Sequence, residues 1–224
     1  MHLSSKIQRK ESVIKPIAVL LILLLFFSLT AYAHPDHIIV GCGDFRPMFF
    51  QSEDQGIDGR DIDLWRLWSQ KTGFTVEFRV MEWNKVIPAL LAHEIDVANG
   101  ATHTPERAKI MAFTQPHEEL LSYLFFHKNT YPFRSISDLS EKIVGVLKGS
   151  NIEEYLSLTV PDATVIAASN YEELVTDALE GRTQVFVAEE PLASYYINKF
   201  DSTNEFKRSL NPILDSSLSM AVRH

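Results

Sequence analysis

The sequence contains little that could fix the chain covalently or through a bound ion. It has one cysteine, Cys42, among 224 residues, so an internal disulfide is excluded. No spacing is typical of a metal site, no Ser/His/Asp order is typical of a hydrolase, and no phosphate-binding loop stands out. We therefore expect no metal, no cofactor and no catalytic residue. The sequence also shows no internal repeat and no low-complexity segment.

Positive charge is also scarce in this sequence. The chain carries 21 Lys and Arg against 29 Asp and Glu, a formal net charge of −8 at pH 7. Four of the basic residues lie among the first 33 residues, which leaves 17 basic and 28 acidic residues after them. Because no Lys/Arg cluster remains there, we expect no nucleic-acid partner. The acidic balance favours solubility and does not select a ligand.

The first 33 residues have the pattern of a signal peptide. A basic segment, Lys6–Lys15, precedes the apolar run Ile17–Leu29, and Ala31-Tyr32-Ala33 resembles a cleavage site. We expect export to the periplasm with cleavage after Ala33. A retained anchor is the disfavoured alternative, because the run is short against the roughly 20 residues of a membrane span. Residues 39–42 imitate a lipidation box, but their alternation predicts a strand with a core thiol.

Strand and helix patterns alternate along the rest of the chain in two series. The first series predicts strands at 37–42, 74–81 and 95–98 and helices at 61–72 and 83–93. After a long apolar strand at 120–127, the second series predicts strands at 143–147, 164–168 and 184–188 and helices at 151–158, 171–179 and 191–199. A last strand is predicted at 218–222. This alternation predicts an α/β fold with two parallel-sheet units joined near residues 126–134.

Two local patterns in the first series predict further detail. Residues 45–50 form an aromatic-rich segment typical of a loop, and residues 51–59 are typical of a polar turn. In the helix that follows, apolar residues recur at helical spacing, which predicts one buried stripe: Ile62, Leu64, Trp65, Leu67 and Trp68.

The segment Asn99–Thr114 contains the main candidate for a binding site. Thr104 can cap a helix whose first position is Pro105, and Glu106 then lies in the first turn, where an anion is favoured. The free N–H groups at this helix start and the planar fork of Arg107 could hold a small acid. The alternative is an ordinary strand–loop–helix joint with a solvated arginine, and these residues alone do not decide between the two.

A resemblance decides between these interpretations. The stretch from Gly100 to Arg107, Gly-Ala-Thr-His-Thr-Pro-Glu-Arg, followed by Phe113-Thr114, is similar to the signature of the family 3 extracellular solute-binding proteins. The similarity covers nearly all of residues 38–223. It implies a two-lobed type II periplasmic binding protein, with two Rossmann-like lobes joined by a hinge, that closes around an amino acid. It also implies that Thr102 and Arg107, in the motif that starts at Gly100, clamp the α-carboxylate of the ligand.

Other blocks of the first series also resemble this family. The sequence Asp44-Phe-Arg-Pro47 is similar to a loop whose aromatic residue, here Phe45, packs on the ligand side chain. Trp83 matches an aromatic position that faces the cleft. The block Gly59-Arg-Asp-Ile-Asp63 is similar to a Gly-Phe-Asp-hydrophobic-Asp pattern of the family, with Arg60 in place of the usual Phe.

Two blocks of the second series resemble the family as well. Gly145–Ser150 is similar to the second-lobe loop that holds the ligand carboxylate, which implies contacts from Ser150 and Asn151. Val187–Pro191 is similar to the block whose acidic residue, here Glu189, binds the α-ammonium group. Three candidates are predicted at the carboxyl ends of strands, where such sheets bind ligands: Thr102, Ser150 and Glu189.

Each candidate residue also has a purely structural interpretation. Arg107 could pair only with Glu106 or a neighbouring acid, a contact that contributes little when exposed. Ser150 could serve only as a helix cap, and Glu189 could be only a first-turn carboxylate. The two aromatic candidates could be ordinary core residues.

The resemblance also implies where the lobes begin and end. It assigns residues 34–126 to lobe one, 127–217 to lobe two and 218–224 to a strand that returns to lobe one. Family members continue from this strand with C-terminal helices that pack on lobe one, and we expect these helices to be missing here. Their absence would expose apolar surface on lobe one.

Three functions fit these observations. The main hypothesis is a periplasmic protein that binds a zwitterionic or carboxylate ligand, most simply an amino acid, for an ABC transporter permease. The second is a ligand-sensing domain that works with a signalling partner, because Arg60–Gly73 resembles the variant found in histidine kinases and diguanylate cyclases. The third is an enzyme similar to arogenate or prephenate dehydratases, with carboxylates from Glu172, Glu173 or Glu189. The sequence does not identify the ligand.

Overall fold

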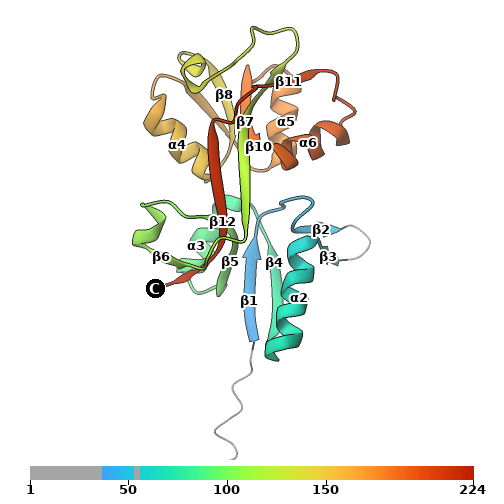
Figure 1. The fold of residues 1–224 in the computed structure, drawn as a ribbon, viewed down its shortest axis with the longest axis vertical. Coiled ribbons are helices and arrows are strands. Elements are labelled where there is room, and N and C mark those ends of the chain that lie inside the picture. The colour runs from blue at the N-terminus through green and yellow to red at the C-terminus, as the bar shows by residue number, and fades with distance from the viewer. Residues whose placement is uncertain (1–36, 53–55) are drawn as a thin grey trace, which may run out of the picture. The chain divides into compact units, whose positions relative to one another are not determined.

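Parallel strands form the centre of each half of the chain and belong to one sheet (Figure 1). The computed structural model describes residues 37–52 and 56–224, and the predicted signal peptide lies outside them. The parallel strands of the first half are β1 (His37–Cys42), β4 (Thr75–Val80) and β5 (Val97–Thr102). Those of the second half are β8 (Ile143–Leu147), β9 (Thr164–Ala168) and β10 (Val185–Glu189). The predicted α/β fold class is confirmed.

Two long antiparallel strands, β7 (Glu118–His127) and β12 (Leu214–Arg223), connect the two halves. The sheet order is β4-β1-β5-β12-β7-β10-β8-β9, so these strands lie between the two parallel sets, as Figure 1 shows. Leu218 of β12 is paired with Thr102 of β5 and with Glu118 of β7. From Ser122 onward, β7 pairs with β10. The structure thus places the crossing within β7 and β12, whereas the residue boundaries of the lobes stay a prediction.

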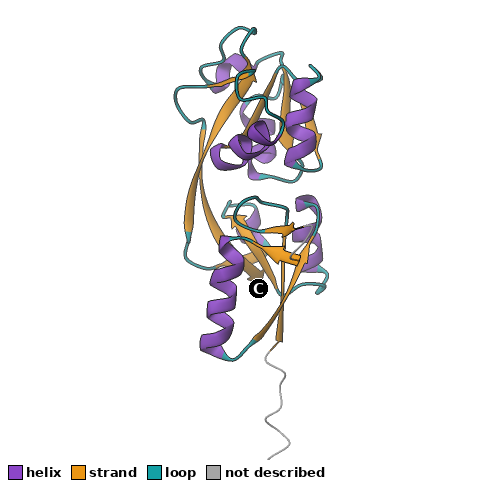
Figure 2. Ribbon diagram, turned by 90° about the vertical axis from the view of Figure 1, so that its right-hand side faces the viewer, coloured by secondary structure: helices purple, strands orange, loops and turns teal. Residues whose placement is uncertain are grey.

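Helices cover both faces of the sheet in each half (Figure 2). The described helices are α2 (Arg60–Thr72), α3 (Trp83–Leu91), α4 (Asn151–Thr159), α5 (Tyr171–Leu179) and α6 (Glu190–Lys199), with 3₁₀ turns η2 (Arg107–Lys109) and η3 (Ile136–Leu139). Within residues 37–52 and 56–224, no helix is long and apolar enough to cross a membrane.

Strand β10 shows why the second half has two cores. All five of its residues are buried, as the near-continuous apolar run of a central parallel strand predicts. Phe186 and Ala188 pack in the core that α5 and α6 cover. Val185 and Val187 pack in the opposite core with Ile152 of α4. Successive side chains of a strand point to opposite faces, so one strand supports both helix layers.

Helix α2 corrects one prediction for the first half. Ile62 and Trp65 are buried with Val40 of β1, as the apolar spacing predicts. Leu64, Leu67 and Trp68 are exposed, so the predicted stripe is too wide. On a helix these three positions turn away from the face that Ile62 and Trp65 present to the sheet.

The predicted helix after Thr104 is also wrong. The Thr104 hydroxyl does accept the Arg107 N–H group at 3.2 Å, as a cap would, but only the 3₁₀ turn η2 follows. The chain then enters β6 (Met111–Phe113), which pairs with residues 221–223 of β12, and Met111 is buried. Pairing with a distant strand therefore overrides the local helix signal.

Short strands occur at positions where the sequence analysis predicts no strand. β2 (Phe50–Ser52) and β3 (Gly56–Asp58) form a small antiparallel pair where a polar turn was expected. β11 (Phe206–Arg208) pairs with β7 at the edge of the second half. Strands of three residues lack the length for a clear alternation, so pattern alone does not reveal them.

A polar network, buried at Trp65, Asn99 and Asp61 and exposed at Arg60, ties α2 to β5 and β7. The Trp65 indole donates to Asn99 Oδ1 at 3.0 Å, and the Asn99 amide donates to Asp61 Oδ2 at 3.0 Å. Arg60 donates to the carboxylates of Asp61 and Glu118, with 2.8 Å between Arg60 Nη1 and Glu118 Oε1. Arg60 thus anchors the start of β7. Because Asn99 lies in β5, the network fixes the strand whose end reaches the candidate site.

The pKa of the Asp61 carboxyl is lowered although the group is buried. Burial alone would raise this pKa, but the interactions with His117, Asn99 and Arg60 outweigh it. A carboxyl of this kind stabilises the folded state above its unfolded pKa of about 3.9. That stabilisation is lost as the pH falls through the lowered pKa of the folded state.

We expect Asp61→Asn to lower the free energy of unfolding at pH 7 by about 1–3 kcal/mol, because a buried charged acceptor is lost. The further loss of stability between neutral and acidic pH should be smaller than in the wild type, since position 61 no longer titrates. Urea unfolding at several pH values measures both effects. Asp63→Asn is the control, because Asp63 lies on the exposed side of α2 and pairs with Arg66. Identical pH profiles of the two variants would contradict the role of Asp61.

Candidate functional site

A cavity lies between the two halves at the carboxyl ends of all six parallel strands. Its empty volume is about 880 Å³, part of it open to solvent. Each of the six strands contributes a lining residue at or just after its last position. The lining includes all eight candidates from the sequence: Phe45, Trp83, Gly100, Thr102, Arg107, Ser150, Asn151 and Glu189. The structure brings them together, and their role in binding stays a prediction.

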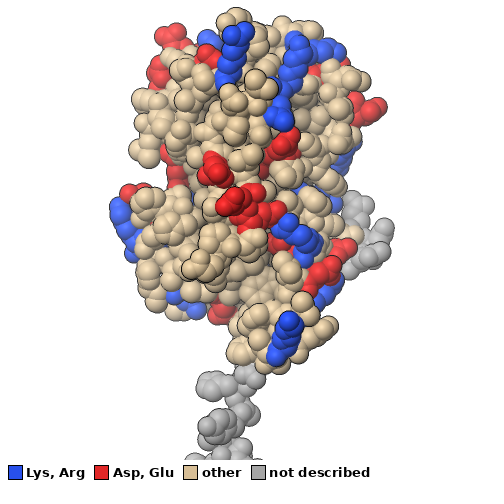
Figure 3. Space-filling model, viewed as in Figure 1, with Lys and Arg blue, Asp and Glu red and all other residues tan. Residues whose placement is uncertain are grey.

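Carboxylates outnumber basic groups among the described residues that line the cavity. Asp44, Glu82 and Glu189 are acidic, and Arg107 is the basic residue. The pKa of Asp44 is raised because burial outweighs its contact with Arg46, at 3.0 Å. Figure 3 shows further Asp and Glu side chains gathered over the middle of one face, where Figure 1 draws β7 and β12. This distribution of charge favours the approach of a cation.

Arg107 reaches the cavity from the turn that follows β5. Its side chain is 4% exposed, so its N–H donors need partners within the protein. The guanidinium donates to the main-chain oxygen of Gly149 at 3.0 Å and, more weakly, to that of Thr102 at 3.4 Å. The Gly149 oxygen belongs to the second half, so Arg107 forms a contact across the cavity.

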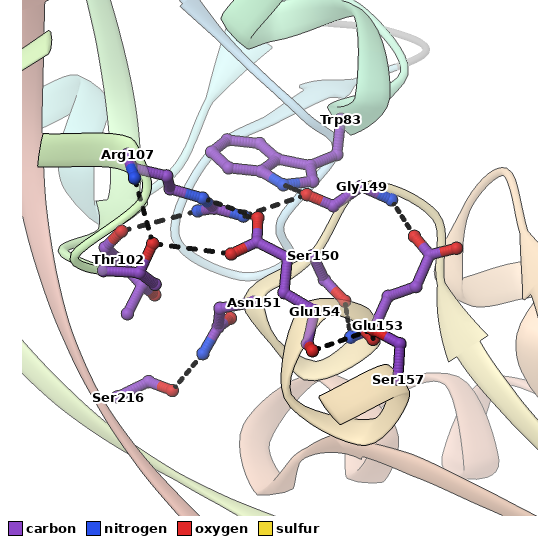
Figure 4. Close-up of polar contacts among 11 residues, drawn as sticks. Trp83, Thr102, Arg107, Gly149, Ser150, Asn151, Glu153, Glu154, Ser157 and Ser216 are labelled. Atoms are coloured by element: carbon purple, nitrogen blue, oxygen red, sulfur yellow. Dashed lines mark hydrogen bonds and ion pairs between the residues drawn. The ribbon is translucent and has the colours of Figure 1, made fainter. Parts of the chain in front are cut away.

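Glu154 of α4 is the acidic partner of Arg107, and sequence reasoning missed it. Glu154 Oε1 accepts from Arg107 Nε at 3.0 Å and from Nη2 at 2.8 Å (Figure 4). Glu106, the neighbour considered from the sequence, pairs with Lys109 instead. One signal was available: Glu154 lies three positions after Asn151, so both lie on the same face of the helix.

The loop between β8 and α4 positions the candidates of the second half. Ser150 caps α4, since its hydroxyl accepts the Glu153 N–H group at 3.1 Å, while Glu153 accepts from the Gly149 N–H group. The Asn151 amide donates to the Ser216 hydroxyl at 2.8 Å. Ser150 therefore is a helix cap and also lines the cavity. Asn151 links α4 to β12.

This loop docks closely on the first half at Gly149. The Trp83 indole and the Arg107 guanidinium both donate to the Gly149 oxygen, at 3.1 and 3.0 Å (Figure 4). Gly149 has a φ of +73°, and a Cβ atom there would lie 3.0 Å from the Cα atom of Asn84. Glycine therefore suits this position through both its conformation and its lack of a side chain.

Glu189 ends β10 and lies buried in the cavity wall. The Tyr171 hydroxyl donates to Glu189 Oε2 at 2.6 Å. Burial raises the pKa of the Glu189 carboxyl, which the hydrogen bond from Tyr171 only partly offsets. Burial also raises the pKa of Tyr171, so this phenol stays a donor. Phe45 packs edge-on against the Tyr171 ring, with centroids 6.2 Å apart, which covers this end of the cavity.

Comparison with known sequences identifies related proteins. The model of the family described as bacterial extracellular solute-binding proteins, family 3, matches residues 38–216. The arginine-binding extracellular protein ArtP of Bacillus subtilis (strain 168) is 28% identical over 166 residues, which cover 73% of this chain and 64% of ArtP. The L-cystine-binding protein TcyJ of Escherichia coli (strain K12) is 25% identical over 169 residues, 74% of this chain and 64% of TcyJ. The chain spans a little under two thirds of the length of these relatives.

Solved structures confirm the two-lobed periplasmic-binding fold. An ancestral arginine-binding protein bound to arginine has a TM-score of 0.76 and 30% identity, with 84% of each chain covered. The holo ArgBP of T. maritima also has a TM-score of 0.76, at 25% identity, covering 84% of this chain and 82% of that one. A histidine kinase sensor domain with similarity to periplasmic binding proteins has a TM-score of 0.79 at 23% identity and equal coverage, which shows the fold alone.

We expect Gly149→Ala to disturb the docking of the two halves, whereas Gly181→Ala should not. Both glycines have a φ of +73°, so the strain of about 1–2 kcal/mol for alanine is common to both variants. Of these two glycines, only Gly149 would bring its added Cβ atom close to the other half of the protein, at Asn84. Spin labels at the exposed positions of Leu91→Cys and Leu158→Cys, on α3 and α4, measure the separation. A distance that stays the same in Gly149→Ala would contradict the docking contact.

Proposed function

The chain belongs to the bacterial extracellular solute-binding proteins of family 3, and on this premise we propose that it captures a free amino acid in the cavity between its halves. The observation that carries the proposal is the position of Arg107 and Glu189 in one cavity, on the first and the second half respectively. A zwitterion presents opposite charges at its two ends and is complementary to such a pair. Closure of the halves around the ligand would bring both groups to it.

The cavity favours an amino acid with a positively charged side chain. Asp44 and Glu82 add acidic groups to the lining, and each pairs with a basic residue, Arg46 and Lys85 respectively. Arg107, the basic residue among the described lining residues, pairs with Glu154. Among these described residues, Glu189 has the neutral Tyr171 hydroxyl and no basic side chain as its partner, and a carboxylate of this kind in a partly enclosed site favours a ligand of net positive charge. Two of the relatives named above agree, since ArtP and the ancestral protein bind arginine, whereas TcyJ is named for L-cystine. We assign the ligand to the class of arginine and similar basic amino acids.

Each candidate residue has a role in this proposal. Arg107 and the end of β5, Gly100 and Thr102, hold the ligand carboxylate together with the start of α4, Ser150 and Asn151. Free N–H groups at a helix start favour an anion. Glu189 accepts the ligand α-ammonium, and the rings of Phe45 and Trp83 cover the side chain.

The proposed setting is the periplasm or the outer cell surface, as the family of extracellular proteins indicates. In this proposal, residues 1–33 direct export and are removed after Ala33. The partner is the permease of an ABC transporter, since one matched relative, from Escherichia coli (strain K12), is named ABC transporter arginine-binding protein 1. The relatives named here are binding proteins rather than enzymes, and the proposal assigns no reaction to the cavity.

A thermal-shift screen against the twenty amino acids tests the proposal. Binding to the folded state raises the melting temperature by mass action, by the equivalent of about 2.7 kcal/mol at a ligand concentration of 100 Kd. We expect arginine and lysine to give the largest shifts. A cooperative melting transition that no amino acid moves would contradict the proposal.

Arg107→Ala tests the site within the same screen. The variant should melt cooperatively and lose most of the shift, because the carboxylate of every amino acid loses its guanidinium partner. Arg66→Ala is the control, since Arg66 lies exposed on α2 and pairs with Asp63. If Arg107→Ala and Arg66→Ala bound the ligand equally well, the assignment of Arg107 would fail.

We expect the affinity for the amino acid to fall as the pH is lowered. The α-ammonium requires Glu189 as a carboxylate, whereas burial raises its pKa in the protein without ligand. Binding is therefore strong above the raised pKa and is lost below it. At a pH near this pKa, binding of the ligand releases a proton from Glu189. Calorimetry in buffers of different ionisation enthalpy measures this proton.

Two variants separate this effect from other titrations. Glu189→Gln should abolish the proton release and weaken binding, because a neutral amide replaces the carboxylate. Glu172→Gln should keep the proton release, since Glu172 lies exposed on α5 and pairs with Lys199. Proton release that persists in Glu189→Gln would assign the titration to another group.

A further inference from the structure

Glu154 places a protein carboxylate on Arg107, the residue assigned to the carboxylate of the ligand. Its Oε1 atom accepts from Nε and Nη2 of Arg107, at 3.0 and 2.8 Å. Its Oε2 atom lies 3.4 Å from the Thr104 hydroxyl. Figure 4 shows the Glu154 side chain reaching from α4 toward the guanidinium. The two residues come from opposite halves of the protein.

The hydrogen-bond donors of Arg107 are almost fully used by these contacts. A guanidinium has five N–H groups, one on Nε and two on each terminal nitrogen. Nε and one Nη2 group point to Glu154, the other Nη2 group points to the Gly149 oxygen, and one Nη1 group points to the Thr102 oxygen. Among the contacts of the described residues, this leaves one Nη1 group for a ligand. Arg107 therefore cannot form a two-bond fork with a ligand carboxylate while Glu154 holds its other edge.

The charge of Arg107 is also balanced before a ligand arrives. Glu154 supplies one negative charge in direct contact, and Arg107 is the basic residue among the described residues that line the cavity. An amino acid with one carboxylate needs only the remaining donor and the N–H groups at the start of α4. A second carboxylate on a ligand would meet no uncompensated positive charge among the described residues that line the cavity. Burying this carboxylate without a partner is costly.

The local structure directs Glu154 to this position. Ser150 caps α4, and Glu153 turns back to the Gly149 N–H group, which leaves Glu154 on the face that carries Asn151. Acidic residues are common in the first turn of a helix because of the helix dipole. The dipole accounts for an acidic residue at this point but not for two hydrogen bonds to an arginine of the other half.

We propose that Glu154 is a specificity-determining residue that neutralises Arg107 and thereby excludes ligands with a second carboxylate. This inference rests on the proposed amino-acid function of the cavity. In this scheme Glu154 does not contact the carboxylate of the ligand. It acts through Arg107, as a positioning residue. Removing the Glu154 carboxylate should change the affinity for ligands with two carboxylates relative to the affinity for ligands with one. It should not only change both affinities by the same factor.

Calorimetry with arginine, glutamine and glutamate tests this inference on the wild type, Glu154→Gln and Glu106→Gln. Glutamine at position 154 keeps the length of the side chain and removes its charge. We expect the affinity for glutamate relative to arginine to rise at least tenfold in Glu154→Gln, which corresponds to about 1.4 kcal/mol. Glu106→Gln is the matched control, because it removes the same charge from the neighbour of Arg107 that pairs with Lys109 on the surface.

A purely structural role of Glu154 predicts a different result. If the contact between Glu154 and Arg107 only held the two halves together, its loss would weaken the binding of all three amino acids by the same factor. The ratio of their affinities would then stay unchanged. That outcome would overturn the inference, as would an equal change of the ratio in Glu106→Gln.

Succinate, a dicarboxylate without an ammonium group, separates this inference from the proposed function. We expect succinate to raise the melting temperature of Glu154→Gln and to leave the wild type and Glu106→Gln unchanged. If the wild type binds no amino acid but succinate behaves in this way, the proposed function fails and the role of Glu154 stands. If amino acids bind while neither the affinity ratio nor the succinate shift changes in Glu154→Gln, the proposed function stands and the role of Glu154 is wrong.

Discussion

Two antiparallel strands, β7 and β12, hold both halves of the protein in one hydrogen-bonded sheet. Residues 214–218 of β12 pair with β7, and Leu218 also pairs with the last residue of β5. Because the parallel strands of both halves end at the same cavity, this shared sheet positions the lining residues at the strand ends. The site needs no dedicated scaffold of its own, since strand ends and helix starts already converge there.

Because Arg107 and Glu189 are buried, these two charged groups of the cavity have a strong effect on which ligand it can bind. Glu189 is held by Tyr171, and Arg107 is held by Glu154 and by main-chain oxygens. A charged group that leaves water needs such partners, so each contact also limits what a ligand can still receive. The selectivity of the cavity then follows from which donors and charges remain available, in addition to its shape.

The elements that the sequence predicts well are those with a strong local pattern. The strands at 37–42, 143–147 and 164–168 and the helix at 171–179 have the predicted bounds, because apolar periodicity and turn residues agree there. The helix predicted after Thr104 is wrong because β6, which follows the turn, pairs with residues of β12 that lie more than a hundred positions away. The exposure of Trp68 also depends on which face of α2 meets the sheet. Local sequence carries neither piece of information.

The candidate site shows the same division between local and distant information. Its eight residues were found through motifs that surround strand ends, and the structure places all eight in one cavity. Glu154 was not predicted because it belongs to no such motif and is separated from Arg107 by 47 positions in the sequence. A contact between halves is set by the three-dimensional path of β7 and β12, which no pattern within a single segment reports.

The pairing of β5 with β12 has a consequence for how the chain acquires its structure. Thr102 and Leu218 are neighbours in the sheet but are separated by 116 positions, and the second half lies between them. The parallel strands of the second half follow one another in a continuous segment of the chain. Their contacts with each other can therefore form as soon as this segment has been synthesised. The first half must wait for β12 before the edge of β5 is covered. Until then β5 presents an open edge, a surface on which other strands can add. The order of synthesis therefore leaves the edge of the strand that carries Thr102 uncovered until β12 has been made.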